Sequence, residues 1–255
     1  IVHCEGGYQH DLRGEVSHGA ENRHYRLRNY QNRCCENYPT HELGPIAKIL
    51  DINRGNRMLK LVSMASGAWG LNAFAEAHDD VDPALRSYPF KQGDVVKTLI
   101  QCAHGETICL TLDTTLPRYY NRNFTIRGTK GFFGETENMV YIDGKCVEFG
   151  HDNFNNVAEY RKEWEHPVWK HFEEEGVKGG HGGMDWLVFD AYFTALRDGM
   201  VPPIDTYDTA AWMAITPLSE ISIANGSMPV DIPDFTRGMW THRTDKNTGF
   251  YALDK

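Results

Sequence analysis

The chain has 255 residues and a formal net charge of −9, because 35 acidic residues outnumber 26 basic ones. Hydrophobic residues make up 41% and charged residues 24%, a balance typical of a globular protein and unlike that of disordered or fibrous chains. The acidic balance disfavours nucleic acid or an anionic membrane surface as a partner, and no apolar run is long enough for a membrane span.

The first residue is Ile1 rather than Met, and residues 1–4 have the pattern of a strand. We therefore expect the chain to be a fragment that lacks an N-terminal part, and any signal segment with it. The six cysteines form no C-x-x-C pair, and the adjacent Cys34 and Cys35 are poorly placed for a mutual disulfide or for zinc. We expect reduced thiols, no metal site and a cytoplasmic location.

Residues 1–8 predict a strand that ends at Gly6 and Gly7. Polar residues follow at once, and ligand-binding side chains often gather just past the end of a strand. For His10 and Asp11 taken singly, a local cap of the next short helix is the preferred interpretation.

Residues 21–33 are rich in Arg, Asn and Tyr and show no clear period. They predict a long loop, and long loops in compact domains are often functional. Arg26 and Arg33 are candidates for binding ligand oxygens, with solvated surface arginines as the alternative.

The most informative stretch places a phenol, a hydroxyl and an imidazole close together, in Tyr38, Thr40 and His41. Pro39 fixes its own φ angle and biases Tyr38 towards extended geometry, and Thr40 can then cap a helix through residues 46–50. Backbone N–H groups point outwards at a helix start, which suits a polyhydroxylated ligand. An ordinary capped helix with a surface histidine is the alternative.

The middle of the chain predicts a mostly antiparallel sheet. Strands are expected at residues 57–64, 94–102, 107–113, 124–128, 131–134 and 139–142. The second and third of these have the signature of a hairpin. Tyr120 lies on the connection that follows the hairpin, where aromatic faces suit sugar stacking, although exposed tyrosines are also normal on loops.

The last third predicts helices, the first of them at residues 164–175. A glycine-rich run at residues 179–183 precedes a strongly periodic helix that ends before residue 199. Because glycines permit close backbone approach, His181 is a further candidate site residue, with a hinge that carries an exposed histidine as the alternative. A final helix is expected to kink at Pro217.

Five short runs together carry a resemblance to a known family. They are residues 7–13, 38–41, 43–47, 53–57 and 182–185. In combination they resemble the C-terminal domain of Gfo/Idh/MocA-type oxidoreductases. Within that group they are most similar to the NAD-dependent glycosidases of glycoside hydrolase family 109, and the resemblance extends from residue 2 to about residue 240.

The resemblance implies an α+β fold with a large, mostly antiparallel or mixed open sheet and helices packed on one face. Residues 1–255 would form a single substrate-binding and oligomerisation domain. An N-terminal Rossmann domain, absent from this chain, would bind most of the NAD, which agrees with the lack of a Gly-x-Gly-x-x-Gly motif after a strand. The expected partners are a carbohydrate substrate, that Rossmann domain, and further copies of the chain in a homo-oligomer such as a dimer.

The resemblance also implies site residues, position by position. The implied substrate contacts are Tyr8, Arg26, Tyr38, Pro39, Thr40, His41 and Tyr120. Tyr38 also matches a residue close to the cofactor, and the implied catalytic residues are His41, Tyr38 and Tyr120. The chain departs from the family at Tyr25, where Trp is usual, and at residues 34–36, which leaves the identity of the sugar open.

The implied chemistry is an exception to hydrolysis by two carboxylates. The sugar hydroxyl at C3 is oxidised with NAD, a base removes the acidified C2 proton, the C1 leaving group departs, and water and the hydride return. His41 has the unperturbed pKa of a base or its relay, Tyr38 and Tyr120 would orient or polarise oxygens, and Arg26 would anchor a hydroxyl or acetamido oxygen.

Two alternatives accompany this interpretation. One is the C-terminal domain of an NAD(P)-dependent sugar dehydrogenase on the same fold, and the other is a non-catalytic sugar-binding and dimerisation domain. Because the cofactor-binding half would lie outside this chain, we expect the chain alone to be inactive.

Overall fold

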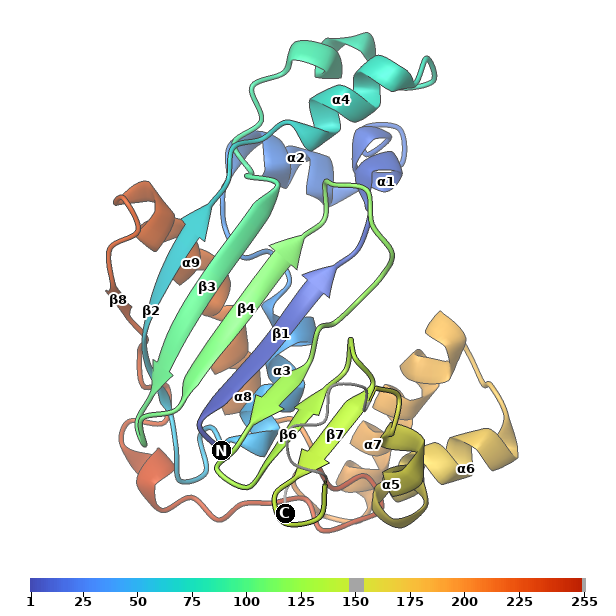
Figure 1. The fold of residues 1–255 in the computed structure, drawn as a ribbon, viewed down its shortest axis with the longest axis vertical. Helices are drawn as coiled ribbons and strands as arrows, with labels where there is room; N and C mark the ends of the chain where they lie inside the picture. The colour runs from blue at the N-terminus through green and yellow to red at the C-terminus, as the bar shows by residue number, and fades with distance from the viewer. Residues whose placement is uncertain (147–153, 254–255) are drawn as a thin grey trace.

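The computed structural model describes residues 1–146 and 154–253, and one eight-stranded sheet runs through them. The strands are β1 (His3–Gln9), β2 (Met58–Ala65), β3 (Val95–Cys102), β4 (Thr107–Asp113), β5 (Thr125–Arg127), β6 (Gly131–Gly134), β7 (Met139–Ile142) and β8 (Val230–Asp231). Their order in space is β7-β6-β5-β1-β4-β3-β2-β8, so the first strand of the chain lies within the sheet (Figure 1).

Strand pairing follows the prediction at the hairpin, where Leu99 of β3 lies opposite Cys109 of β4. The described strand pairs are antiparallel except for β1 and β4, which are parallel. β1 continues past Gly6 and Gly7, so the predicted strand end at these glycines is wrong. Gly6 is needed inside the strand because a helix crosses there: a Cβ atom on it would lie 2.4 Å from the backbone oxygen of Glu42.

Nine α-helices accompany the sheet in the part of the chain that the structure describes. They are α1 (Arg13–Ser17), α2 (Tyr25–Asn32), α3 (Pro39–Ile49), α4 (Gly70–Ala77), α5 (Val157–Trp164), α6 (Pro167–Glu175), α7 (Met184–Arg197), α8 (Thr206–Met213) and α9 (Ile215–Ala224). Figure 1 shows α3, α8 and α9 behind the central strands, α1, α2 and α4 beyond the end of β1, and α5 to α7 beside β7. The predicted α+β fold, an open sheet with helices on one face, is confirmed. Over these same residues, each helix is too short or too polar to cross a bilayer.

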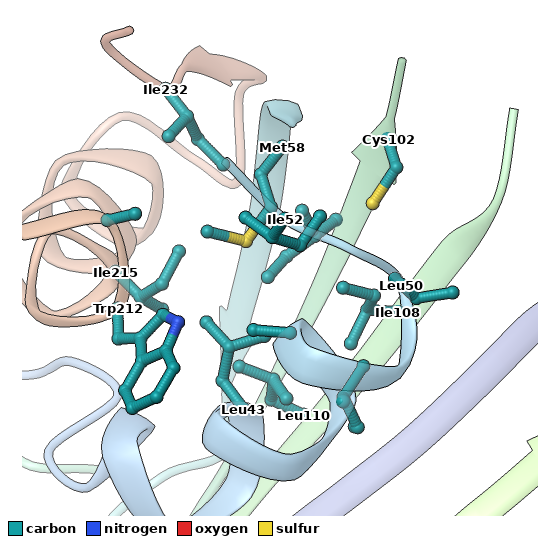
Figure 2. Packing of buried hydrophobic residues seen from close by; sticks show 14 of the residues in the cluster. Leu43, Leu50, Ile52, Met58, Cys102, Ile108, Leu110, Trp212, Ile215 and Ile232 are labelled. Atoms are coloured by element: carbon teal, nitrogen blue, oxygen red, sulfur yellow. The ribbon is translucent and has the colours of Figure 1, made fainter. Parts of the chain in front are cut away.

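The main core lies between the sheet and α3. Buried apolar residues recur at spacings of three and four along α3 and at its C-cap: Leu43, Ile46, Ala47 and Leu50. Figure 2 shows Leu43 of this helix facing Leu110 of β4 on one side and Trp212 of α8 on the other. Gly44 gives the Trp212 ring its room, since a Cβ atom there would lie 3.3 Å from the ring. The helix is therefore fixed between two layers.

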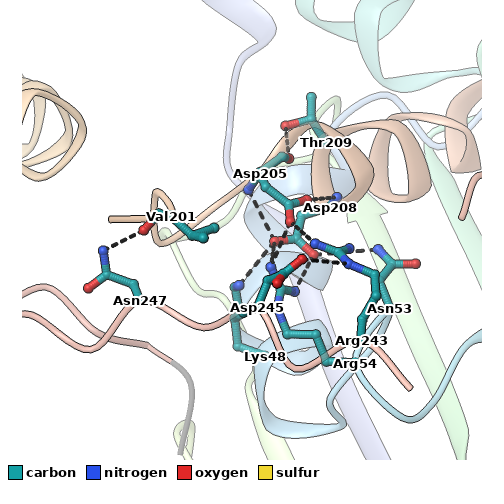
Figure 3. Close-up of polar contacts among 10 residues, drawn as sticks. All are labelled: Lys48, Asn53, Arg54, Val201, Asp205, Asp208, Thr209, Arg243, Asp245 and Asn247. Carbon is teal, nitrogen blue, oxygen red and sulfur yellow. Dashed lines mark hydrogen bonds and ion pairs between the residues drawn. The ribbon is translucent and has the colours of Figure 1, made fainter. Parts of the chain in front are cut away.

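A buried charge cluster fixes the other end of α3 (Figure 3). Lys48 Nζ lies 3.0 Å from Asp208 of α8, and Arg54 contacts both Asp208, at 2.8 Å, and Asp205, at 2.9 Å. Arg243 from the C-terminal segment also binds Asp205, at 2.6 Å. Burial alone would raise the pKa of Asp208, but Arg54 and Lys48 hold it below its usual range. The cluster joins three segments that are far apart in the sequence.

Two further predictions before residue 50 are wrong. The predicted loop at residues 21–33 contains α2, whose first backbone N–H groups are capped by the His24 ring, which accepts from Arg26 N–H at 3.2 Å. The helix was missed because its cap is a histidine and few of its side chains are apolar. Thr40 does not cap α3: Tyr38 stands at the N-cap and Pro39 begins the helix, where a missing N–H costs nothing.

Two helices of the sequence analysis differ in their bounds. The helix predicted at residues 164–175 begins only at Pro167, as α6, and Trp164 is the last residue of a separate helix, α5. The final helix is divided at Ala214 rather than kinked at Pro217. Pro217 lies in the first turn of α9. In a continuous helix its ring would clash with the backbone carbonyl four residues earlier, so one helix ends and another begins there.

Candidate functional site

Five rings gather where β1 ends and α3 begins, and we call them the aromatic cluster. They belong to Tyr8, His10, Tyr38, His41 and Tyr120. Tyr8 and Tyr38 stack with centroids 4.1 Å apart, and His41 meets both edge-on, at 5.0 and 5.1 Å. Tyr120 closes the group, 6.2 Å from Tyr8 and 5.1 Å from His10. Such offset and edge-to-face geometries are the favourable ones for aromatic rings.

Three segments bring these rings together for local reasons. Tyr8 is held in the parallel β1–β4 pair, opposite Leu112. Tyr38 and His41 are three residues apart at the start of α3, a spacing that places two side chains on the same side of a helix. An isolated antiparallel bridge between Gln9 and Asn121 draws the segment that carries Tyr120 alongside the end of β1.

Arg26 supports the cluster from α2 and is itself only 8% exposed. Its guanidinium donates to the Tyr38 hydroxyl and to the Glu15 carboxylate, and it lies 2.9 Å from His24 Nε2. It also stands over the Tyr38 ring, 4.9 Å from the centroid. Arg26 Nε is buried without a hydrogen-bond partner. Arg26 was predicted to bind substrate, and in the structure its Nη2 donates to Tyr38 while its Nη1 is engaged with Glu15 and His24.

Arg122 is a second cation at the cluster, which the sequence analysis did not select. Its Nη1 donates to the backbone oxygen of His41 at 3.0 Å, and its Nε donates to the Tyr120 hydroxyl. Arg122 thus ties the segment that carries Tyr120 to the first turn of α3. The signal available in the sequence was its place two residues after Tyr120, in a connection rich in Tyr and Arg.

Burial and these cations set the protonation of the cluster. The pKa of His41 is lowered to about 4, first by burial and then by the charges of Arg122 and Arg26. The pKa of Tyr8 is raised, with burial as the main cause. At neutral pH the cluster therefore presents a neutral imidazole and protonated Tyr8 beside two guanidinium groups. The site can donate and accept hydrogen bonds without carrying a negative charge on these two rings.

The remaining candidates of the sequence analysis fall into two groups. Pro39 is buried at the first position of α3, and Thr40 Oγ1 lies 3.4 Å from His41 Nδ1, so both belong to the same segment as the cluster. His181 contacts Asp185 at 2.9 Å on the exposed approach to α7. Arg33 is engaged with Glu220 of α9 at 2.6 Å. The structure therefore joins the first two to the cluster through their backbone and shows the other two in separate ion pairs.

Sequence reasoning preferred a capping role for His10 and missed two glutamates altogether. His10 Nδ1 lies 3.3 Å from the Tyr8 hydroxyl, so its ring faces the cluster. Asp11 does make a local contact, an ion pair with Arg13 at 2.7 Å. Glu36 and Glu42 are both fully buried and flank the Tyr38–His41 segment on either side. An acidic residue at each end of that segment was visible in the sequence, but burial was not.

The chain resembles glycosidases in sequence and dehydrogenases in fold. Residues 1–242 match the family described as "Glycosyl hydrolase 109, C-terminal domain". The chain is 39% identical over 262 residues to a glycosyl hydrolase family 109 protein of Stenotrophomonas maltophilia, covering 95% of this chain and 57% of that protein. It is 38% identical to the alpha-N-acetylgalactosaminidase of Tannerella forsythia, with 95% and 55% covered.

Among solved structures, levoglucosan dehydrogenase in complex with NADH superimposes with a TM-score of 0.57 at 17% identity, covering 92% of this chain and 59% of that one. At that identity the likeness shows a shared fold. The chain spans little more than half the length of the curated relatives that it matches. On the match over residues 1–242, the chain belongs to the glycosyl hydrolase 109 C-terminal domain family.

Proposed function

We propose that this chain is the substrate-binding domain of an NAD-dependent glycosidase that acts on N-acetylhexosaminides. The observation that carries the proposal is the aromatic cluster: a neutral imidazole and phenols, beside Arg26 and Arg122, at the start of α3. Sugars are recognised by such hydrogen-bonding rings and guanidinium groups. The name of the Tannerella forsythia relative supports a hexosaminide as the substrate class.

The chain fits a role beside NAD rather than as its main binding site. Within residues 1–146 and 154–253, the one parallel strand pair is β1 with β4, and neither strand is followed by the glycine motif that holds a pyrophosphate. Tyr38 fits a place next to the cofactor, because its half-buried phenol is held at the mouth of the site by Arg26. When bound, NAD supplies a reversible acceptor for the hydride on sugar C3.

The residues of this chain would act on the sugar around that exchange. Tyr38 and Tyr120 hydrogen-bond the sugar hydroxyls and so fix the ring. Once C3 is a ketone, the C2 proton is acidic, and neutral His41 accepts or relays it. The C1 leaving group then departs, and water adds to C1 while the proton returns to C2. Arg26 and Arg122 stabilise the negative charge that develops on the sugar oxygens.

The lowered pKa of His41 refines this role. A ring with a pKa of about 4 is free to accept a hydrogen bond at neutral pH, but it is a weak base. His41 is therefore better suited to relaying a proton, or to orienting a hydroxyl, than to holding the C2 proton as an imidazolium. Because His41 is a weak base, it readily gives the proton back to C2, which a reversible elimination requires.

The test is turnover of a chromogenic N-acetylgalactosaminide by the full-length protein in deuterated water, with NMR at C2 of the released sugar. Deuterium at C2 without accumulation of NADH is the expected result. NADH accumulation without glycoside cleavage would move the protein to the sugar dehydrogenases, and cleavage without deuterium would point to direct hydrolysis.

Variants connect this chemistry to the cluster. His41→Ala should abolish the exchange at C2, whereas His104→Ala, in the turn between β3 and β4, should leave it unchanged. Equal turnover by His41→Ala and wild type would remove His41 from the mechanism. The isolated 255-residue chain, tested with added NAD, should show no turnover, and activity there would overturn the need for a second domain.

A further inference from the structure

Two buried glutamates face each other beneath the aromatic cluster. Glu36 precedes α3 and Glu42 lies in its first turn, and both have no exposed surface. The pKa of each carboxyl is raised mainly by burial and is also shifted by the other carboxyl and by backbone N–H groups, of Leu112 for Glu36 and of Tyr8 and Thr111 for Glu42. Within residues 1–146 and 154–253, none of the four carboxyl oxygens has a hydrogen-bond partner. Four buried carboxyl oxygens without a partner are costly unless a proton lies between them.

Among the described residues, no basic side chain is a main influence on this pair. The strongest influences on both groups are burial, the other carboxyl and backbone N–H groups, and none of these is a basic side chain. The titratable groups around the pair are Tyr8 of β1, Cys109 of β4, Tyr30 of α2, Cys35 before α3 and His41 of α3. From α9, Ser219 and Thr216 bind only the backbone of Glu36.

All five of these neighbouring groups are neutral at pH 7. Burial raises the pKa of the two tyrosines and two cysteines, and it lowers that of His41 to about 4. The contrast with the buried charge cluster at the other end of α3 is direct, because there every carboxylate meets a Lys or Arg. Two adjacent carboxylates in an apolar site cannot both ionise without a large cost.

We propose that Glu36 and Glu42 share one proton and, joined by it, act as positioning residues that hold the Tyr38–His41 segment in shape. The five residues between them include every site residue of that segment. An O–H···O⁻ hydrogen bond between the two carboxyls joins the two ends of this segment. Such a charge-assisted hydrogen bond is stronger than one between neutral groups. The positioning role rests on the proposed function of the segment, whereas the shared proton does not.

The shared proton predicts how stability depends on pH. Burial raises the pKa of Glu36 to about 7 and that of Glu42 well above the usual range. The folded protein therefore keeps a proton that the unfolded chain has already released, so this pair loses stabilising effect as the pH rises from about 4.5 through 7. This is the opposite sign to that of an ordinary salt-bridged carboxylate.

Thermal unfolding of the full-length protein between pH 5 and pH 8 tests the shared proton. Glu42→Gln keeps a group that can donate a hydrogen bond to Glu36 but has no proton to lose. Its Tm should exceed that of wild type by about 3 °C or more at pH 8, and the gap should shrink towards pH 5. The control Glu173→Gln, on the exposed face of α6, should follow wild type throughout. Parallel curves for Glu42→Gln and wild type would overturn the proposal.

The positioning role is tested without substrate, by NMR of ¹³C-labelled histidine in the full-length protein. The His41 signal, assigned by its loss in His41→Asn, should keep its position in Glu42→Gln and should move or broaden in Glu42→Ala. If Glu42→Ala does not fold, Glu36→Ala removes the same hydrogen bond from the other side. An unchanged His41 signal in the alanine variant would overturn positioning. Because neither readout requires turnover, a failure of the proposed glycosidase activity would leave both results interpretable.

Discussion

At the scale of single residues, the environment of the aromatic cluster changes the chemistry that its members would have in water. A solvent-exposed histidine titrates near neutral pH, but burial and the two guanidinium groups of Arg122 and Arg26 keep His41 neutral far into the acid range. Tyr38 is likewise defined by its neighbours, with Tyr8 stacked on its ring and Arg26 on its hydroxyl. The function of each ring therefore depends on contacts from other segments.

The low pKa of His41 predicts the acid limb of the pH profile. Activity should not fall between pH 8 and about pH 5.5 through protonation of His41, since the ring stays neutral until the pH approaches 4. Arg122→Gln removes one of the charges that lower this pKa, so the NMR titration midpoint of His41 should rise. Arg118→Gln, whose guanidinium pairs with Asp113, should leave the midpoint in place. A wild-type midpoint near 6.5 would contradict this account of the site.

Tyr38→Phe tests the hydroxyl while keeping the stacked ring. The variant removes the group that accepts from Arg26 and that we propose binds the sugar, so kcat should fall by about 10²-fold with a smaller change in KM. Tyr25→Phe is the matched control, because the Tyr25 hydroxyl lies 3.2 Å from that of Tyr38 but does not bind Arg26. Equal losses in the two variants would mean that the hydroxyl pair, and not Tyr38 alone, carries the effect.

The sequence allowed part of this site to be predicted. Tyr38, Thr40 and His41 could be found because they are neighbours in the chain, and their spacing at a helix start is a local signal. His10 and Arg122 could not be weighed in the same way, because what brings them to the cluster is pairing between β1 and a segment more than 100 residues away. The burial of Glu36 and Glu42 likewise depends on β1, β4 and α9, which no local pattern reveals.

At the scale of elements, α3 organises the molecule, because it carries the site at one end and the charge cluster at the other. Its position against β1 depends on an absent side chain, since the backbone oxygen of Glu42 lies 2.4 Å from where a Cβ atom on Gly6 would be. Strands and the periodic helices were predictable from alternation and spacing. The strand through Gly6 and Gly7 was not, because glycine usually ends a strand and only the crossing helix explains it.

Gly6→Ala should therefore destabilise the protein strongly. The new methyl group meets backbone rather than a movable side chain, so α3 must shift away from the sheet, at a cost of about 2–3 kcal/mol and a fall in Tm of roughly 5–10 °C. Gly14→Ala in α1 is the control: its Cβ atom would lie 3.8 Å from Phe74, and alanine favours a helix. A Tm for Gly6→Ala within a degree of wild type would show that α3 is free to move.

At the scale of the whole molecule, one face of the sheet is covered by α3, α8 and α9 (Figure 1). The opposite face carries exposed apolar side chains. Met64 of β2 is 63% exposed and Leu99 of β3 is 54% exposed, and Leu99 pairs across the strands with Val62. Isolated exposed apolar residues are ordinary, but a group of them on one flat surface is typical of an interface. We expect this face to join two copies of the protein.

Light scattering on the full-length protein tests this interface by mass. Leu99→Lys places a charge at the centre of the face, so it should convert a dimer into monomers and should leave the Tm of the monomer nearly unchanged, because the residue is exposed in the isolated chain. Val188→Lys on α7, a residue of similar exposure at 65%, is the matched control. Dissociation by Val188→Lys but not by Leu99→Lys would transfer the interface to α7, where Phe189 and Phe193 are also exposed. A monomeric wild type would contradict this prediction, because the apolar sheet face would then stay exposed to solvent in solution.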